Sequence, residues 1–340
     1  MRFQVESNRV NLPSAIVHST ALEAIYLAST NFGVSVNEKA HLLLDDANEV
    51  ARSSNVPFAE AYTLGVRGFV DCAIGNWERA RRELTEVIDG FRKQHALHRW
   101  EVRMCRSWLM LTEVFSGRVN RATDIAHEFC KQKESDIVQY SLGAWAIIEV
   151  HIQKGEVAEA EARLLEWGSL IDHTQMTHFR FLYEVARNSV DTAHGRGQQV
   201  LDRMRRIERE VRDSGCTLGG WDLALWNLSG INAAITLLES NRLFDKERSY
   251  ARKLAGSLLK RSPMFFRCMG HRFLALLYGL EGNDKAMMSR MRTALSLSEN
   301  AGVPYYRLQC LASARKAGVF DSSLIKELAD LQTQTEFQCL

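Results

Sequence analysis

The sequence predicts an all-α protein, an α-solenoid of about eight helical hairpins that runs as one unit through residues 1–340. Three observations lead to this fold class. Glycines recur at intervals close to 40 residues, the period at which helix pairs stack. The apolar residues between them follow the three- and four-residue spacing of amphipathic helices. The four prolines keep a nearly constant distance from the glycines that follow them.

The recurring glycines mark turns inside the hairpins. They are Gly33, Gly75, Gly117, Gly155, Gly195, Gly282 and Gly318, separated by 42, 42, 38, 40, 87 and 36 residues. The interval of 87 residues corresponds to two repeats, and its middle turn falls at Ser240 and Asn241. Asparagine tolerates the left-handed backbone that ends many helices, so Asn241 is predicted to replace a glycine there.

The prolines locate the beginning of the first helix in a hairpin. They are Pro13, Pro57, Pro263 and Pro304, which lie 20, 18, 19 and 14 residues before a repeat glycine. Proline is favoured in the first turn of a helix, where its missing N–H is not needed. Each proline therefore predicts a helix start, and the glycine after it predicts the turn into the second helix.

Taken in order, the hairpins give sixteen helices. The first helices are predicted at 13–31, 57–74, 97–115, 136–153, 175–193, 220–238, 263–281 and 303–316. Their partners are predicted at 36–53, 77–94, 118–133, 157–171, 198–213, 243–260, 283–299 and 321–332. Apolar stripes support them, for example Trp77, Ala80, Leu84, Val87, Ile88 and Phe91. The turn-rich segment 214–220 is the predicted hinge.

The composition describes an ordered chain with a large core. Apolar residues make up 46% and charged residues 25%, and the net charge is +2. This balance favours neither nucleic acid nor membrane partners. No apolar run reaches the length of a membrane span, and residues 1–9 lack the apolar core of a signal peptide, so we expect a cytoplasmic protein. The seven cysteines include no CxxC pair, which argues against zinc and against a disulfide framework.

Two segments carry a resemblance to a known repeat. The stretches from Gly75 to Ala80 and from Gly155 to Ala160 look like the turn and helix start of the tetratricopeptide repeat. The region 56–318, with Trp100, Glu101 and Trp108, resembles the C-terminal helical part of large bacterial serine/threonine kinases that also carry a predicted ATPase module. The resemblance implies a right-handed superhelix and a role in a signalling assembly.

The catalytic motifs of such proteins are absent from the sequence. It contains no GxGxxG, HRD or DFG motif and no GxxxxGK[ST] loop. The tripeptides that begin at His98 and His271 lack the aspartate that a kinase needs. His127 and Glu128 begin a HExxH pattern, but Lys131 stands where the second histidine would be. We therefore predict no catalytic residue, no cofactor and no metal site.

Arginines on the first helices give a hypothesis for partner binding. They are Arg99, Arg103, Arg106, Arg180, Arg187, Arg267 and Arg272. Guanidinium groups on a concave face suit an acidic or phosphorylated peptide, and Trp100, Met104 and Trp108 are expected on the buried face beside the first three. The alternative is that these arginines only solubilise the surface. The cluster at Arg203, Arg205, Arg206, Arg209 and Arg212 alternates with acidic residues and predicts a self-neutralised solvent face.

Three functions are open at the level of the sequence. The first is a non-catalytic scaffold or regulatory module that binds a protein or peptide partner in bacterial signalling. The second is a detached C-terminal regulatory segment of a serine/threonine kinase whose catalytic domain is missing. The third is a small-molecule sensor that uses the concave groove as its pocket.

Overall fold

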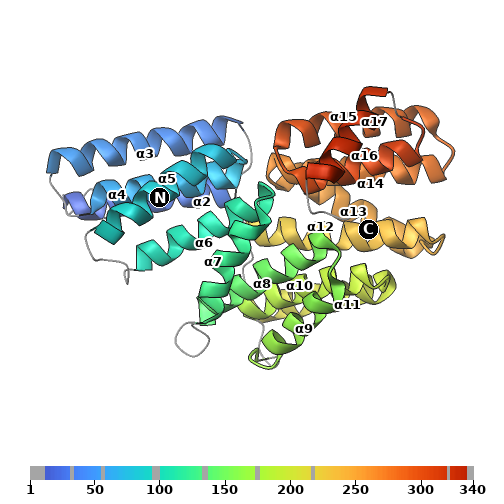
Figure 1. The fold of residues 1–340 in the computed structure, drawn as a ribbon, viewed down its shortest axis with the longest axis horizontal. Coiled ribbons are helices and arrows are strands. Elements are labelled where there is room, and N and C mark those ends of the chain that lie inside the picture. The colour runs from blue at the N-terminus through green and yellow to red at the C-terminus, as the bar shows by residue number, and fades with distance from the viewer. Residues whose placement is uncertain are drawn as a thin grey trace. The chain divides into compact units, whose positions relative to one another are not determined.

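The chain is all-α in its described part. The computed structural model describes residues 12–30, 34–54, 58–93, 100–131, 137–172, 177–215, 219–319 and 322–334, and every regular element in them is an α-helix (Figure 1). The helices are α2 (Pro13–Thr30), α3 (Val34–Ser54), α4 (Ala59–Ile74), α5 (Trp77–Lys93), α6 (Trp100–Phe115), α7 (Val119–Cys130), α8 (Ile137–Lys154), α9 (Val157–Gly168), α10 (His178–Ala193), α11 (Gly197–Ser214), α12 (Gly220–Glu239), α13 (Asp245–Arg261), α14 (Met264–Leu280), α15 (Asp284–Ala301), α16 (Pro304–Lys316) and α17 (Ser322–Gln334).

All sixteen predicted helices are present, with ends that differ from the predicted ones by three residues at most. The agreement follows from the local signals. Pro13 and Pro304 are the first residues of α2 and α16, and Pro263 directly precedes α14, as predicted. Pro57 lies outside the described residues.

The turns inside the hairpins have the predicted backbone geometry. Six of the seven repeat glycines are described, and all six have positive φ, from 69° at Gly318 to 92° at Gly75. Asn241 replaces a glycine with φ of 56°, which confirms the prediction, while Gly33 lies outside the described residues. At Gly75 the chain reverses direction, and two backbone hydrogen bonds close the turn. The N–H of Gly75 donates to the carbonyl of Cys72 at 3.2 Å, and the N–H of Asn76 donates to the carbonyl of Asp71 at 2.8 Å.

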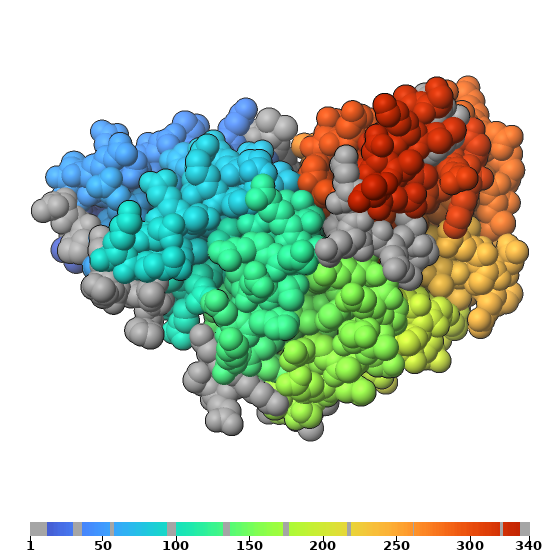
Figure 2. All heavy atoms as spheres, viewed as in Figure 1, coloured from blue at the N-terminus to red at the C-terminus, as the bar shows by residue number. Residues whose placement is uncertain are grey.

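The contacts divide the chain into two compact units, Met1–Glu113 and Val114–Leu340. In the first unit, α2 packs against α3 and α4, and α4 packs against α3 and α5. In the second unit, the first helices of successive hairpins contact one another in the order α8, α10, α12, α14 and α16, and α9, α11, α13, α15 and α17 each pack on the first helix of their own hairpin. On the face shown in Figure 2, side chains fill the spaces between neighbouring helices of each unit.

The expected single array over 1–340 and the hinge at 214–220 stay predictions. Of the hinge, residues 216–218 lie outside the described part, Ser214 ends α11, Gly215 has φ of 69°, and Gly220 begins α12. The described helices include none with the combined length and apolar character that crossing a lipid bilayer requires.

Large side chains fill the core of each unit. The largest fully buried residues of the second unit are Trp167, Trp226, Tyr140, Phe129, Phe181, Phe265, Phe266 and Phe273. Tryptophan packing between helices is confirmed for Trp77, Trp145, Trp167 and Trp226, which are 6%, 2%, 0% and 1% exposed. Burial of this size is the main stabilising contribution, since each such side chain adds roughly 1.5 to 3 kcal/mol.

Candidate functional site

The second unit contains a cavity of about 300 Å³ on the side of its first helices. Helices α8, α10, α12, α14 and α16 all contribute to its wall, together with Val114 and Phe115 at the end of α6. Its polar lining residues are Glu149, Gln153, Ser189, Thr192, Ser229, Asn232, Thr236, Glu239, Arg272 and Gln309. Gly195 and Glu239 are exposed to solvent, so the cavity reaches the surface beside the C-terminal ends of α10 and α12.

The helical period explains how these residues come to share one wall. On α8, Trp145, Glu149 and Gln153 are spaced by four residues and therefore lie along one face of the helix. On α10, Ser189 follows Val185 at the same spacing. Each first helix thus adds one stripe to the cavity.

Glu149 is the most perturbed group in the cavity. The Ser189 hydroxyl donates a hydrogen bond of 2.8 Å to its Oε1 atom. Burial raises the pKa of Glu149 to about 7, although the bond from Ser189 acts in the opposite direction. Among the residues that the structure describes, no lysine, arginine or histidine forms an ion pair with it. An isolated buried carboxyl of this kind is costly to ionise and is a marker of functional sites.

Other polar atoms of the lining are left without partners. The Oε1 atom of Gln153, the Oδ1 atom of Asn232 and the Oγ1 atom of Thr192 are buried and have no hydrogen-bond partner within the described chain. The Gln153 side chain is only 5% exposed. Because buried polar atoms are nearly always hydrogen-bonded, these atoms identify a place where a ligand or ordered water supplies the missing bonds.

An aromatic cluster forms one side of the cavity. The Phe115 ring lies 5.7 Å from the Phe266 ring, 6.4 Å from the Trp145 ring and 6.5 Å from the Tyr306 ring, measured between centroids. Burial raises the pKa of Tyr306 well above its usual value, and the nearby carboxylate of Glu149 adds to the effect. Tyr306 therefore stays a neutral phenol at physiological pH, with its neighbour Tyr305 also in the wall.

Arg272 is the one predicted partner-binding arginine that lines this cavity, among those that the structure describes. It is 8% exposed, and its Nε and Nη1 atoms donate to the side chains of Ser313 at 2.7 Å and Gln309 at 3.0 Å. These bonds tie α14 to α16, so much of its hydrogen-bonding capacity is already used inside the protein.

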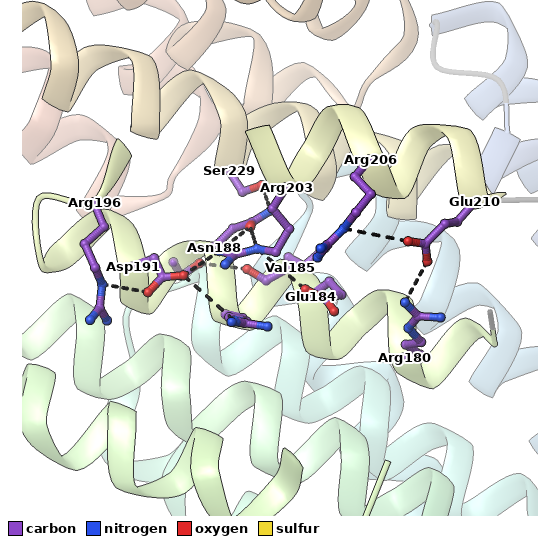
Figure 3. Close-up of polar contacts among 12 residues, drawn as sticks. Arg180, Glu184, Val185, Asn188, Asp191, Arg196, Arg203, Arg206, Glu210 and Ser229 are labelled. Atoms are coloured by element: carbon purple, nitrogen blue, oxygen red, sulfur yellow. Dashed lines mark hydrogen bonds and ion pairs between the residues drawn. The ribbon is translucent and has the colours of Figure 1, made fainter. Parts of the chain in front are cut away.

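The other arginines of the second unit also have intramolecular partners. Arg180 pairs with Glu210 at 2.6 Å (Figure 3), and Arg187 lies 3.9 Å from Asp191. The Nε atom of Arg267 donates to the backbone carbonyl of Ser262 at 3.2 Å, and burial lowers the pKa of Arg267. Their role in partner binding stays a prediction.

Arg103 and Arg106 belong to the first unit and are half-buried on α6. The prediction that Trp100 lies on the buried face beside them is wrong, because Trp100 is 52% exposed. Val102 and Cys105 are buried in its place, so the inward face of α6 is rotated relative to the predicted stripe. Arg99 lies outside the described residues.

The arginine cluster of α11 also differs from its prediction at one position. Arg206 is exposed, as expected of a solvent face, but Arg203 is 8% exposed and lies in the core. Its Nη2 atom contacts Asp191 at 2.6 Å, and its Nε and Nη2 atoms donate to the Asn188 side chain at 3.0 and 2.9 Å (Figure 3). This network connects α10 with α11, and the bond of 3.2 Å from Asn188 to Ser229 continues it to α12.

A comparable buried charge lies in the first unit at the turn after α4. The Asp71 carboxylate is fully buried and has His41 at 3.4 Å, Arg79 at 3.1 Å and Asn76 at 3.0 Å. Burial alone would raise the pKa of Asp71, but the hydrogen bonds from His41 and Asn76 and the charge of Arg79 outweigh it and lower the pKa. Because Asn76 and Arg79 flank the turn, this cluster stabilises the hairpin.

Sequence reasoning missed Glu149, Gln153, Ser189 and Asn232. The sequence did contain a signal for Glu149, because this residue interrupts an apolar run from Trp145 to Val150. A charged residue inside such a run requires a partner or a function.

The cavity can bind a small group or side chain and can exchange a proton with it through Glu149. Within the described ranges, no three histidine, cysteine or acidic side chains gather in a way that could hold a metal ion. The sequence as a whole matches no model of a known protein family, and a search of curated proteins likewise gives no match.

Proposed function

We propose that this chain is a non-catalytic helical-repeat recognition module, a right-handed array of tetratricopeptide-like hairpins that binds its target on the inner side of its first helices. The observation that carries the proposal is the cavity of the second unit, with buried polar atoms that lack partners. The target is a partner peptide or a small signalling molecule, of which at least one group enters the cavity.

Its size and chemistry support a binding role. A volume of about 300 Å³ is at the lower end of the range for small-molecule sites. Gln153 and Asn232 would each gain the hydrogen-bond partner that they lack, and Glu149 would gain a second partner beside Ser189, which offsets the cost of burying these groups. The resemblance to the repeat region of bacterial kinase proteins supports a place in a signalling assembly, either as a free protein or as a detached regulatory segment.

The enclosed form of the site favours the small-molecule sensor over a scaffold that uses only an open groove. A flat peptide surface would not require unpaired buried groups on three different helices, α8, α10 and α12. A partner that inserts one side chain would satisfy the same groups.

A thermal-shift screen with metabolites and signalling peptides tests the proposal. The full chain is compared with Ala193→Leu, which places three more carbon atoms in the cavity wall near its opening, and with Ala158→Leu on the exposed face of α9. We expect compounds that raise the Tm of the wild type and of Ala158→Leu but not that of Ala193→Leu. Stabilisation that Ala193→Leu leaves unchanged would place the binding surface elsewhere, and the absence of any stabilising compound would contradict the proposal.

A further inference from the structure

The unpaired polar atoms of the cavity are mainly hydrogen-bond acceptors. They include the Oε1 atom of Gln153 and the Oδ1 atom of Asn232, and beside them lies the carboxyl of Glu149, whose Oε1 accepts a bond from Ser189. Glu149 and Gln153 are one helical turn apart on α8, and Asn232 contributes from α12. A ligand that satisfies all three must donate several hydrogen bonds in one small region.

The charged side chains of the lining indicate which charge a ligand of the cavity carries. Three charged side chains line the cavity within the described chain: Glu149, Glu239 and Arg272. Lys316 neutralises Glu239 at a distance of 2.8 Å, and Arg272 already donates to two side chains of α16. Ser313 and Gln309 are neutral and leave the charge of Arg272 in place, but they occupy its Nε and Nη1 donors. Within the described residues, Glu149 is the acidic group of the lining that has no cationic partner, and it accepts a hydrogen bond from the neutral Ser189 hydroxyl.

The aromatic wall favours the same kind of ligand. Phe115, Trp145, Tyr305 and Tyr306 line the cavity on the side of α6, α8 and α16. The faces of aromatic rings attract ammonium and guanidinium groups, and the attraction grows when water is excluded.

Resting on the function proposed above, we infer that the cavity binds an organic cation, a primary ammonium or guanidinium group that pairs with Glu149 and donates hydrogen bonds to Gln153 and Asn232. The cation belongs either to a free small molecule or to a lysine or arginine side chain of a partner. Both have the same head group and both fit a cavity of about 300 Å³. This preference is opposite in sign to the acidic partner that the arginine pattern predicts for the concave face.

Binding should depend on pH through Glu149. Ser189 on α10 and Tyr306 on α16 interact with Glu149, the cavity lining also includes Arg272 on α14 and Glu239 on α12, and no histidine is among the described lining residues. Tyr306 stays a neutral phenol near neutral pH, whereas the pKa of Glu149 is raised to about 7. The affinity for a permanent cation should therefore rise about tenfold from pH 6 to pH 8, with release of a proton on binding.

Ligand-observed NMR titration with matched probes tests the inference, because it measures millimolar binding. One series is phenethylamine, phenethyl alcohol and phenylpropionate, and a second is butylguanidine, butylurea and pentanoate. A third arm compares a short neutral peptide with a single lysine and the same peptide with norleucine. The affinity of each probe is measured for the wild type and for the variants Glu149→Gln and Ala193→Leu. The control is Glu159→Gln, which changes an exposed residue of α9.

We expect the cation of at least one series to bind at least tenfold more tightly than its neutral and anionic analogues, and to lose that advantage in Glu149→Gln but not in Glu159→Gln. Binding by the free amines identifies a small molecule as the source of the cation, and binding by the lysine peptide alone identifies a partner protein. If neutral or anionic probes bind as well and Ala193→Leu abolishes their binding, the cation inference is overturned while the recognition site stands. If no probe shows binding that Ala193→Leu removes, both proposals fail.

Discussion

Single side chains distinguish the second unit from a packing of apolar helix faces alone. Glu149 occupies a position on α8 that an apolar residue would fill in an ordinary core, and within the described residues its hydrogen bond comes from Ser189 alone. The energetic consequence is large, because a carboxyl with a pKa raised from 4.5 to about 7 prefers to keep its proton in the folded protein.

Replacement of Glu149 by glutamine should stabilise the protein at alkaline pH. The folded state binds more protons than the unfolded state between the two pKa values of 4.5 and about 7, so wild-type stability falls as pH rises through this window. Glutamine has no charge to bury, and its advantage in the free energy of unfolding should grow by about 2 kcal/mol from about pH 5.5 to 8.5. Urea denaturation at both pH values measures it, with Glu159→Gln as the control. An advantage of the same size at both pH values would show that Glu149 is not titrating in the core.

Arg203 is the second residue whose role depends on its surroundings. Its side chain is 7% exposed and lies between Asp191 and Glu184, at 2.6 Å and 3.5 Å. Burial lowers the pKa of Arg203, while the charge of Asp191 acts against this effect. Removal of the guanidinium would leave Glu184 buried without a cation among the described residues, and it would take from Asp191 the closest of its three arginines, with Arg196 at 2.8 Å and Arg187 at 3.9 Å remaining.

Arg203→Ala should therefore lower the free energy of unfolding by about 3 to 5 kcal/mol, the usual cost of breaking a buried ion pair from one side. The matched substitution Arg206→Ala, on the same helix and 59% exposed, should cost less than about 1 kcal/mol. Chemical denaturation of the two variants measures the difference. Equal and small losses would mean that the network in Figure 3 adds little to stability.

Helices of this protein pack closely where a glycine faces a neighbour. A Cβ atom built on Gly143 of α8 would lie 2.8 Å from the carbonyl oxygen of Ala126 and 2.9 Å from the Cβ of Phe129, both on α7. The backbones of α7 and α8 can approach this closely only because residue 143 has no side chain. Gly197 of α11 has the same relation to Ala233 of α12, at 2.6 Å.

Gly143→Ala should separate α7 from α8 and lower the free energy of unfolding by about 1 to 3 kcal/mol. The better helix propensity of alanine opposes this by about 1 kcal/mol at most. Gly256 of α13 is the control, because a Cβ there meets nothing within 4 Å, and Gly256→Ala should stabilise by about 0.5 to 1 kcal/mol. Thermal denaturation followed by circular dichroism distinguishes the two; stabilisation by both would show that the close contact relaxes without cost.

The chain as a whole is a helical protein whose long-range contacts follow the repeat. The bond between Ser189 and Glu149 spans 40 residues, and the bond between Asn188 and Ser229 spans 41. In the second unit these bonds join corresponding positions of neighbouring first helices, α8 with α10 and α10 with α12.

Circular dichroism of the intact protein should give a helix content far above the third that is typical of soluble proteins, with no strand signal. The reason is that helices occupy nearly all of the described ranges. A strand signal equivalent to a sheet of three or more strands would contradict the fold class.

The sequence by itself determined the all-α class, the helix ends to within three residues and the turns, because these depend on interactions between residues close in the chain. Apolar spacing, proline at helix starts and the left-handed backbone at Gly75 and Asn241 are all local signals. The predicted inward face of α6 failed at Trp100, since the direction of a helix face is set by its neighbours in space.

Only the tertiary structure decided where the candidate site lies. Sequence reasoning selected arginines, of which Arg272 alone, within the described residues, lines the cavity, and it assigned Arg203 to the solvent. A charged side chain has the same sequence pattern on an exposed face and on a buried one. Whether Glu149 is solvated or isolated depends on side chains about one and four repeats away, Ser189 and Tyr306, and their approach exists only after the hairpins have stacked.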